Sequence, residues 1–417
     1  MRVLHVVPEM DPRMGGVCQA VRTIIAGLSE LAVHNEVVSL DPTDAAFLKN
    51  DPFTVHALGA GKGPWGYNPH LVPWLVSHLP QFDAVVVHGL WLFYGHAVRR
   101  AQRQLQAQRT AGQTLPKVFV MPHGMLDPYF QRASGRRLKA IRNTLYWKLL
   151  EQQLINTADA LLFTCEEERR LATQPFRPYR PQRTVVVGLG VEEPPQQREA
   201  MQQALLAKCP ELAGEPYLLF LSRIHEKKGV ELLLQAYAAV SQQARTTASA
   251  ALVASSGEAA EELAPAPKLP RLLVAGPGLD TPYGQRMQAL VAGSPVLRSA
   301  VSFPGMLTGD AKWGAFYGCE AFVLPSHQEN FGIAVVEALA CGKPVLISDQ
   351  VNIWREIEGA GGGSVRPDTA AGTHELLAHW QQLTAAAKTN FQQQARRTFE
   401  QEFAVRPAAV RFLQAIQ

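Results

Sequence analysis

The amino-acid sequence predicts an α/β protein with the chain arranged in two doubly wound, parallel-sheet domains. Short apolar runs rich in Val, Leu and Phe recur along it, and each is followed by a polar or glycine-containing loop and then by helix-period sequence. Continuous apolar strands that alternate with helices are typical of parallel sheets covered on both faces. The series occurs twice, before about residue 190 and again from about residue 215. We therefore expect two Rossmann-like domains facing a cleft.

The expected strands are the apolar runs 3–7, 84–88, 118–121, 160–164, 218–222, 272–275, 321–325 and 345–348. Between the two series lies a glycine-then-proline passage, 187–195, which suits a domain connection. We expect domains at 1–192 and 193–395, and a C-terminal helix at 396–417 that packs back on the first domain. Residues 241–269 are rich in Ala, Ser, Glu and Pro without a clear period, so we expect a partly disordered insertion there.

Composition bounds the class of protein. Of the 417 residues, 47% are hydrophobic and 18% charged, which is typical of a soluble globular protein. The net charge of +4 is too small for the basic surface that nucleic-acid binding needs. No apolar run reaches the length of a transmembrane helix or a signal peptide, so we expect a cytoplasmic protein. The five cysteines are scattered and contain no C-x-x-C, so neither disulfides nor a zinc site are indicated.

Two cations flank one tight loop after the run 218–222. Arg223 and Lys228 lie either side of this loop, and a helix is expected to follow it. Free amide groups and the helix dipole already favour an anion at a helix N-terminus. The loop therefore suits a diphosphate, although a solvated basic loop would use the same residues.

A second constellation lies in the stretch ENFGIAVVE. Glu329 precedes an expected helix, and Glu337 lies within it among residues that are apolar on nearly every side. An unpaired carboxylate in such a setting is costly, so Glu337 needs a hydrogen-bonding partner or must face a ligand. A carboxylate can accept two hydrogen bonds, which suits the vicinal hydroxyls of a ribose. Glu329 has a simpler alternative, as an acid that stabilises the start of the helix.

The first half of the chain offers weaker signals. Gly15-Gly16 follows the first strand and precedes a helix, so its backbone could approach a phosphate or sugar, although a plain turn would use the same residues. His123 follows the run 118–121, where a histidine can donate to a sugar hydroxyl or a leaving oxygen; a satisfied structural histidine is the alternative. No D-x-D pair and no His/Asp cluster with metal spacing occurs, so we expect no metal, and Arg and Lys side chains would balance the diphosphate charge.

These motifs together resemble glycosyltransferase family 4, whose members are retaining enzymes of the GT-B fold, here of the bacterial surface-polysaccharide type. Glu329 and Glu337 match the family's E-x7-E motif, and LSRIHEKKGVELLLQA matches its R-x4-K-G segment. AGPGLDTPYG and FPGMLTGD match the next two donor-side loops, and Gly15-Gly16 matches the N-terminal loop. The match covers most of the chain and is strongest from 217 to 350, whereas the insertion departs from it and the acceptor half is looser.

The resemblance implies a role for each matched residue. Arg223 and Lys228 would bind the donor diphosphate and stabilise it as it leaves, Glu329 would bind the donor sugar, and His123 would lie near the reacting sugar. The remaining donor-binding residues would be Gly15, Gly16, Gly305, Met306, Leu307, Asn330, Phe331, Gly332 and Glu337, with Glu337 on the ribose hydroxyls and 305–307 beside the base. The donor would be a UDP- or GDP-linked sugar, without a further cofactor or metal. The acceptor would be a glycan or a lipid-linked glycan in polysaccharide or glycoconjugate biosynthesis.

Two other classes of protein remain as alternatives. A sugar-nucleotide epimerase or hydrolase on the same fold would consume the donor without an acceptor. A non-catalytic sugar-nucleotide binder would have lost some of the charged residues, all of which are present here.

Residues 131–148 form a basic amphipathic segment without any acid. Its basic residues are Arg132, Arg136, Arg137, Lys139, Arg142 and Lys148, and Leu138, Ile141, Leu145, Tyr146 and Trp147 lie between them at helical spacing. Such helices can lie on anionic bilayers, so we expect a peripheral contact with the inner membrane face. A solvated helix with an ordinary core-facing stripe is the alternative.

Overall fold

The computed structural model describes residues 1–109, 114–132, 137–254 and 269–417. The chain divides into two compact units, each with its own parallel sheet. Unit 1 comprises Met1–Glu192 together with Glu402–Gln417, and unit 2 comprises Glu193–Gln401. Each unit is a doubly wound α/β fold, so the predicted fold class is confirmed.

Unit 1 contains a seven-stranded parallel sheet in the order β3-β2-β1-β4-β5-β6-β7. Its strands are β1 (Arg2–Val6), β2 (His34–Ser39), β3 (Thr54–Ala57), β4 (Ala84–His88), β5 (Lys117–Met121), β6 (Ala160–Phe163) and β7 (Thr184–Val186). From β1 the chain adds β2 and β3 on one side of the sheet, and it then adds β4 to β7 on the other side. The direction of winding therefore reverses between the neighbouring strands β1 and β4. The carboxyl ends of these central strands are where open α/β sheets bind ligands.

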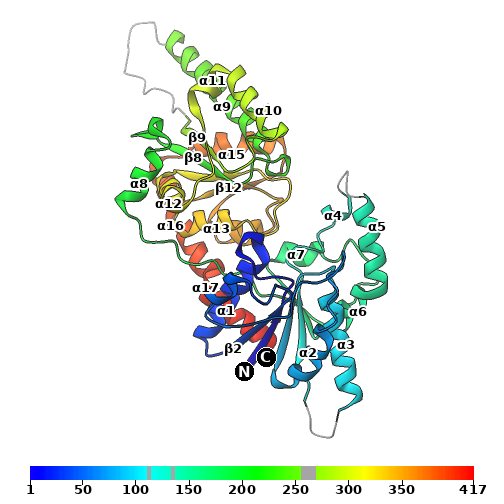
Figure 1. Ribbon diagram of the computed structural model, residues 1–417. Coiled ribbons are helices and arrows are strands. Elements are labelled where there is room, and N and C mark those ends of the chain that lie inside the picture. Colours follow the sequence, from blue (N-terminus) through cyan, green and yellow to red (C-terminus); the bar gives the residue numbers. More distant parts are fainter. Residues whose placement is uncertain (110–113, 133–136, 255–268) are drawn as a thin grey trace. The chain divides into compact units, whose positions relative to one another are not determined.

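The helices of unit 1 cover both faces of this sheet (Figure 1). They are α1 (Gly16–Glu30), α2 (Leu71–His78), α3 (Phe93–Ala107), α4 (Tyr129–Arg132), α5 (Arg137–Tyr146), α6 (Gln152–Thr157), α7 (Glu166–Leu171) and α17 (Val405–Ile416). A π-helical turn, Trp147–Glu151, joins α5 to α6. Figure 1 shows α1 beside α17 on one side of the sheet and α2 beside α3 on the other.

The last helix, α17, closes unit 1 because it packs tightly against α1. A Cβ atom on Gly27 would lie 2.7 Å from Cβ of Ala409, so glycine lets the two helices approach closely. The amide of Val191 donates to the carbonyl of Phe403 at 2.8 Å, which joins the end of the first segment to the returning chain. Residues 396–401 belong to unit 2, where Arg396 pairs with Glu193 at 2.8 Å.

Unit 2 contains a six-stranded parallel sheet in the order β10-β9-β8-β11-β12-β13. Its strands are β8 (Tyr217–Leu221), β9 (Arg271–Ala275), β10 (Val301–Gly305), β11 (Ala321–Leu324), β12 (Val345–Ser348) and β13 (Gly363–Arg366). Its helices are α8 (Glu199–Leu206), α9 (Val230–Ala254), α10 (Pro282–Gly293), α11 (Pro295–Ala300), α12 (Gly309–Gly318), α13 (Ile333–Ala340), α14 (Trp354–Gly359), α15 (Ala370–Gln382) and α16 (Ala385–Thr398).

Within the segment 241–269, where we expected a partly disordered insertion, residues 241–254 continue α9 without a break. Ala, Gln and Leu are good helix formers, so this stretch extends a helix already nucleated at Val230 although its apolar period is weak. Residues 255–268 lie outside the described residues.

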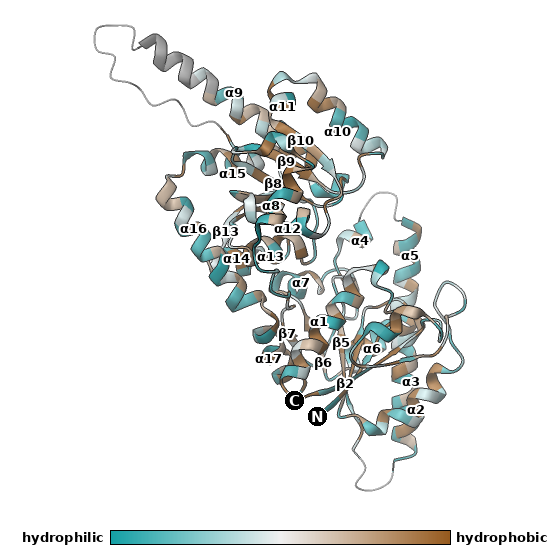
Figure 2. Ribbon diagram, turned by 60° about the vertical axis from the view of Figure 1, so that its left-hand side comes forward, coloured by the Kyte–Doolittle hydropathy of each residue, from teal (hydrophilic) through white to brown (hydrophobic). Residues whose placement is uncertain are grey.

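All eight predicted strands are present, each within one residue of the expected ends. The strands that the apolar pattern did not reveal are β2, β3, β7, β10 and β13. All of these except β2 are edge strands, which are covered less completely and so need not be continuously apolar. Figure 2 shows the brown, apolar strands inside each unit and teal, polar residues on the covering helices. Within the described ranges, no helix is long and apolar enough to cross a membrane.

Candidate active site

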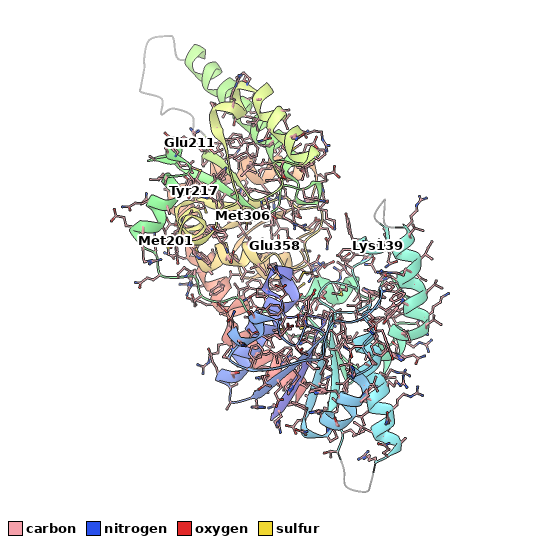
Figure 3. The ribbon with its side chains drawn as sticks, viewed as in Figure 1. Lys139, Met201, Glu211, Tyr217, Met306 and Glu358 are labelled. Atoms are coloured by element: carbon pink, nitrogen blue, oxygen red, sulfur yellow. The ribbon has the colours of Figure 1, made fainter. Side chains whose placement is uncertain are left out.

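A pocket of about 330 Å³ lies in unit 2 at the carboxyl ends of the central strands. Leu221 and Leu324, which end β8 and β11, form part of its wall. Gly276 and Met306 follow the last residues of β9 and β10 and also line the pocket; Met306 is labelled in Figure 3. The pocket therefore occupies the edge of the sheet where α/β proteins bind ligands.

One wall of the pocket combines a cation with the start of helix α13. Arg223 is exposed and lines the pocket together with Ile333 and Ala334. The amide groups of Ile333 and Ala334 lie in the first turn, where an α-helix offers its N–H groups no internal partner. Gly332, which precedes the helix with a left-handed φ of 77°, also borders the pocket. A guanidinium beside free amides is a suitable environment for a phosphate group.

Lys228 and Glu329 form an ion pair at the same edge of the sheet. Lys228 Nζ donates to Glu329 Oε2, and Glu329 lines the pocket. Lys228 is buried, and the next residue, Gly229, turns with a left-handed φ of 68° against Pro325. A Cβ atom on Gly229 would lie 1.9 Å from the carbonyl oxygen of Pro325, so only glycine allows this approach.

Glu337 reaches the pocket from the second turn of α13 and is paired with Lys312 of α12. Lys312 Nζ donates to Glu337 Oε1 at 2.6 Å, and the side chains are 25% and 14% exposed. Lys312 Nζ also lies 4.6 Å from the centre of the Trp313 ring, which favours the cation. The sequence predicted a partner for Glu337 but did not identify Lys312. Spacing of i, i+4 in the sequence reveals ion pairs within one helix, but Lys312 lies on a different helix from Glu337.

Of the other predicted donor-binding residues in unit 2, some line this pocket and others do not. Met306 and Leu307 line it, while Gly305 ends β10 directly before them. Asn330 and Phe331 precede Gly332 and do not line the pocket; Phe331 is buried, and Asn352 Nδ2 lies 3.5 Å from Oδ1 of Asn330.

Gly15 and Gly16 lie in unit 1, where α1 begins at Gly16. Gly15 has a left-handed φ of 76°, and no atom lies within 4 Å of an ideal Cβ at either position. The first helical amides are therefore accessible to a ligand, and the pair forms the expected open turn after β1.

His123 is held rigidly in the turn after β5. Its φ of 52° is left-handed, which is uncommon for a residue with a side chain. The following amide, of Gly124, donates to the buried carboxylate of Glu168 at 2.5 Å. The same carboxylate accepts from Thr164, whose amide lies 2.8 Å from Oε2. Backbone strain that the surroundings support in this way is typical of functional sites.

A further strained turn, which the sequence analysis did not single out, follows β4. Trp91 has a left-handed φ of 74°, and its amide donates to Oε1 of Glu151 at 2.7 Å. Burial raises the pKa of Glu151 to about 7. Glu151 lies in the π-helical turn after α5, so a distant carboxylate holds the loop at the end of β4.

The charged groups around the unit 2 pocket define what it can bind. Arg223 and the first amides of α13 line the pocket and can neutralise phosphate groups, and Glu337 keeps oxygen acceptors for hydroxyl groups. Lys228 does not line the pocket and is paired with Glu329. Across the described ranges, no group of three or more His, Cys, Asp and Glu side chains could hold a metal ion.

Family models match both units. Residues 15–190 match the glycosyl transferase 4-like domain, and residues 202–396 match the glycosyl transferases group 1 domain. Together with the two parallel-sheet units, these matches place the chain in the GT-B glycosyltransferases related to family 4.

Two curated relatives share part of the sequence. The D-inositol 3-phosphate glycosyltransferase of Nocardiopsis dassonvillei is 27% identical over 250 residues, which cover 57% of this chain and 52% of that protein. The sulfoquinovosyl transferase SQD2 of Arabidopsis thaliana is 37% identical over 79 residues, or 19% of this chain and 14% of its own. The chain thus spans about half the length of the inositol-phosphate relative, and less of the second.

Solved structures share the fold over the whole chain. A glycosyltransferase from Rickettsia africae has a TM-score of 0.70 at 15% identity and covers 100% of this chain and 97% of its own. Anabaena HepE in complex with UDP has a TM-score of 0.70 at 16% identity and covers 100% and 99%. At such identities the similarity concerns the fold alone.

Proposed function

We propose that the protein is a retaining glycosyltransferase that moves a hexose from a nucleotide-sugar donor, UDP- or GDP-linked, to a glycan or lipid-linked acceptor in polysaccharide or glycoconjugate biosynthesis. The observation that carries the proposal is the unit 2 pocket, where Arg223, the amides at the start of α13 and the carboxylates of Glu329 and Glu337 come together. These groups match the diphosphate and the hydroxyls of such a donor. Retention of the anomeric configuration follows from the family resemblance.

Each part of the donor has a partner in this proposal. Arg223 and Lys228 take the diphosphate and stabilise its charge as it leaves, which requires no metal ion. Lys312 occupies one oxygen of Glu337, and the carboxylate accepts the ribose hydroxyls. Residues 305–307 border the base, Glu329 binds the sugar, and Phe331 and Gly332 offer backbone amides nearby. The family resemblance also assigns Gly15, Gly16 and His123, which belong to unit 1, to the donor. The UDP complexes of HepE favour UDP as the nucleotide.

A nucleotide-sugar panel tests the donor assignment. At about 100 times its dissociation constant, a bound donor raises the unfolding free energy by about 2.7 kcal/mol, so thermal shifts rank the nucleotides and sugars. The Arg223→Ala variant should lose the shift, whereas Arg298→Ala, on the exposed side of α11, should keep it. Donor consumption that does not depend on an added acceptor would instead favour an epimerase or hydrolase.

We also propose that residues 131–148 contact an anionic membrane surface at which the acceptor is met. The helix α5 and the π-helical turn that follows it, Trp147–Glu151, together present two apolar faces. Tyr146 and Trp147 are buried in unit 1, which accounts for the core-facing alternative. A second stripe is exposed and consists of Leu138 (84%), Ile141 (60%), Leu145 (56%) and Leu149 (68%). Exposed Leu and Ile aligned at helical spacing are characteristic of interaction surfaces.

Charge next to this stripe favours an anionic lipid surface as the occupant. Arg137, Lys139, Arg142 and Lys148 are exposed on the same helical segment, and Figure 3 labels Lys139 on α5. Arg136 belongs to the expected patch but lies outside the described residues. Each basic residue near an anionic bilayer contributes about 1 kcal/mol, and the apolar stripe adds the burial of its side chains.

Vesicle sedimentation tests the membrane contact on the full chain. We expect binding to phosphatidylglycerol-containing vesicles at low salt, weaker binding at high salt, and none to pure phosphatidylcholine. Replacement of Arg137, Lys139 and Arg142 by Glu should abolish binding, while the same change at Arg100 and Arg103 of α3 should not. Absence of vesicle binding at low salt would overturn the membrane contact. It would also be overturned if the protein formed a concentration-dependent dimer that the double substitution Leu138→Ser and Ile141→Ser dissociates, because the stripe would then be a dimer interface.

A further inference from the structure

Three histidines form a hydrogen-bonded row across the central strands of unit 1. His5 lies on β1 and His88 ends β4, and both are completely buried. His5 Nδ1 lies 2.9 Å from His88 Nε2, and His88 Nδ1 lies 3.0 Å from His123 Nε2. His123 is partly exposed, so the row leads from the interior of the sheet to its surface. The proposed function uses His123 but assigns nothing to His5 or His88.

Asn35 on β2 sets the direction of the hydrogen bonds at the buried end of the row. Its side-chain nitrogen donates to the carbonyl oxygen of Val33 at 2.9 Å, and a carbonyl can only accept. The side-chain oxygen of Asn35 therefore faces His5, at 3.2 Å from Nε2. That nitrogen of His5 must carry the proton.

The proton on Nε2 of His5 fixes the direction of every hydrogen bond in the row, because burial keeps the three imidazole rings neutral. Burial lowers the pKa of His5 and of His123 to about 4, and lowers that of His88 well below its ordinary value. A neutral imidazole has one donor and one acceptor nitrogen. With Nε2 of His5 protonated, its Nδ1 accepts from His88, and Nδ1 of His88 accepts from His123.

This leaves Nδ1 of His123 as a bare acceptor. Among the described residues no hydrogen-bond partner exists for that nitrogen. The left-handed backbone of His123 fixes the position of its Cα–Cβ bond, from which the ring extends. We propose that Asn35, His5 and His88 are positioning residues that hold His123 as an obligate hydrogen-bond acceptor for one hydroxyl group of the sugar substrate. The sugar contact rests on the proposed function, whereas the tautomer of the row does not.

The proposal has a consequence for specificity. A neutral acceptor nitrogen accepts a hydrogen bond from a hydroxyl group, but it cannot donate one to a carbonyl, a fluorine or a phosphate at the same place. A site that hydrogen-bonds a hydroxyl discriminates against analogues that lack it, because its own polar group is then left unpaired. Sequence reasoning expected His123 to donate a hydrogen bond, and the row reverses this role.

Nitrogen-15 NMR of histidine-labelled protein tests the row without any substrate. We expect His5, His88 and His123 all to be neutral and protonated at Nε2 at pH 7.5. Asn35→Leu removes the acceptor for His5, and an unpaired buried donor is costly, so the row should reverse and protonate Nδ1 of His123. Asn35→Asp keeps an acceptor there and should retain the original tautomer. His5→Phe replaces Asn35→Leu if that variant fails to fold, and it should reverse the row in the same way.

Donor analogues with a single fluorine in place of each sugar hydroxyl test the sugar contact. One analogue should bind the wild type about tenfold more weakly than the parent, and Asn35→Leu should lose this discrimination. An Nδ1-protonated His123 in the wild type, or an unchanged tautomer in both Asn35→Leu and His5→Phe, would overturn the row. A correct tautomer with uniform binding of all analogues would overturn the sugar contact. Absence of any nucleotide-sugar binding would overturn the proposed function and leave the tautomer decided by NMR.

Discussion

Lys312 and Glu337, which lie 25 residues apart on α12 and α13, are joined by an ion pair of 2.6 Å at the wall of the unit 2 pocket. The pair explains how a carboxylate can lie on an otherwise apolar helix. Because Lys312 takes only one of its oxygens, Glu337 can accept further hydrogen bonds from a ligand. Lys312 thus orients a group that the proposed donor would contact.

The first prediction concerns this pair. Glu337→Gln and Lys312→Met should each raise the KM for the donor more than they lower kcat, since both act on ribose binding. Glu337→Gln should change the unfolding free energy little, because it keeps the shape of the side chain and removes a largely buried charge. Lys312→Met leaves the largely buried Glu337 carboxylate unpaired and should therefore lower the unfolding free energy. In the double variant the two effects on KM should not add, with a coupling of roughly 0.5–3 kcal/mol. Additive effects would mean that Lys312 does not act through Glu337.

The second prediction concerns the charge on the leaving diphosphate. Arg223→Ala should fold normally, because the side chain is exposed, yet lower kcat/KM by about 100- to 1000-fold. Steady-state kinetics with the donor chosen by thermal shift measures this, and Arg298→Ala is the matched control. Turnover near the wild-type value would remove the diphosphate assignment from Arg223.

The third prediction separates stability from activity at Lys228. Lys228→Ala should lose most turnover and also lower the melting temperature, since Glu329 is left without its cation. Adding Glu329→Gln should restore part of the melting temperature but not the activity. Lys388→Ala breaks a comparable ion pair with Glu320 in unit 2 and should leave turnover unchanged. Equal losses in the Lys388 variant would make the effect of Lys228 purely structural.

The fourth prediction follows from the use of side chains to balance the diphosphate. Transfer should continue in EDTA, because Arg223 and Lys228 supply the positive charge. Activity that EDTA abolishes and magnesium or manganese restores would contradict the metal-independent proposal.

The fifth prediction is a pH dependence of unit 1. The unfolded chain protonates a histidine below its ordinary pKa of 6.5, whereas His5 in the folded protein resists protonation down to about pH 4. The unfolded state therefore binds more protons, and stability falls as the pH drops from 6.5 to 4, by roughly 3 kcal/mol for His5 alone. Amide hydrogen exchange of β1 and β4 reports this locally. His5→Phe should weaken the pH dependence, and exchange rates independent of pH after correction for intrinsic chemistry would contradict it.

The sequence by itself determined the fold class and the positions of the motifs. Buried parallel strands are apolar throughout, so the central strands of both sheets were visible as continuous runs. Glycines such as Gly229 are required by local turns, and Arg223 and Lys228 lie in the loop between β8 and α9. Adjacency along the chain therefore carried most of the donor-side prediction. The edge strands were not predicted, because they are only partly covered by helices and so need not be apolar throughout.

Only the tertiary structure decided which distant side chains meet. Lys312 reaches Glu337 from another helix, and Lys228 reaches Glu329 across 101 positions. The row from Asn35 to His123 depends on the strand order β2-β1-β4-β5, which places His5 beside His88, 83 positions further along the chain. Exposure of Leu138 and Ile141 was likewise undecided, because a helical period shows that a stripe exists but not whether another element covers it. Contacts and cover are properties of the packed chain, since they arise from side chains that no local pattern brings together.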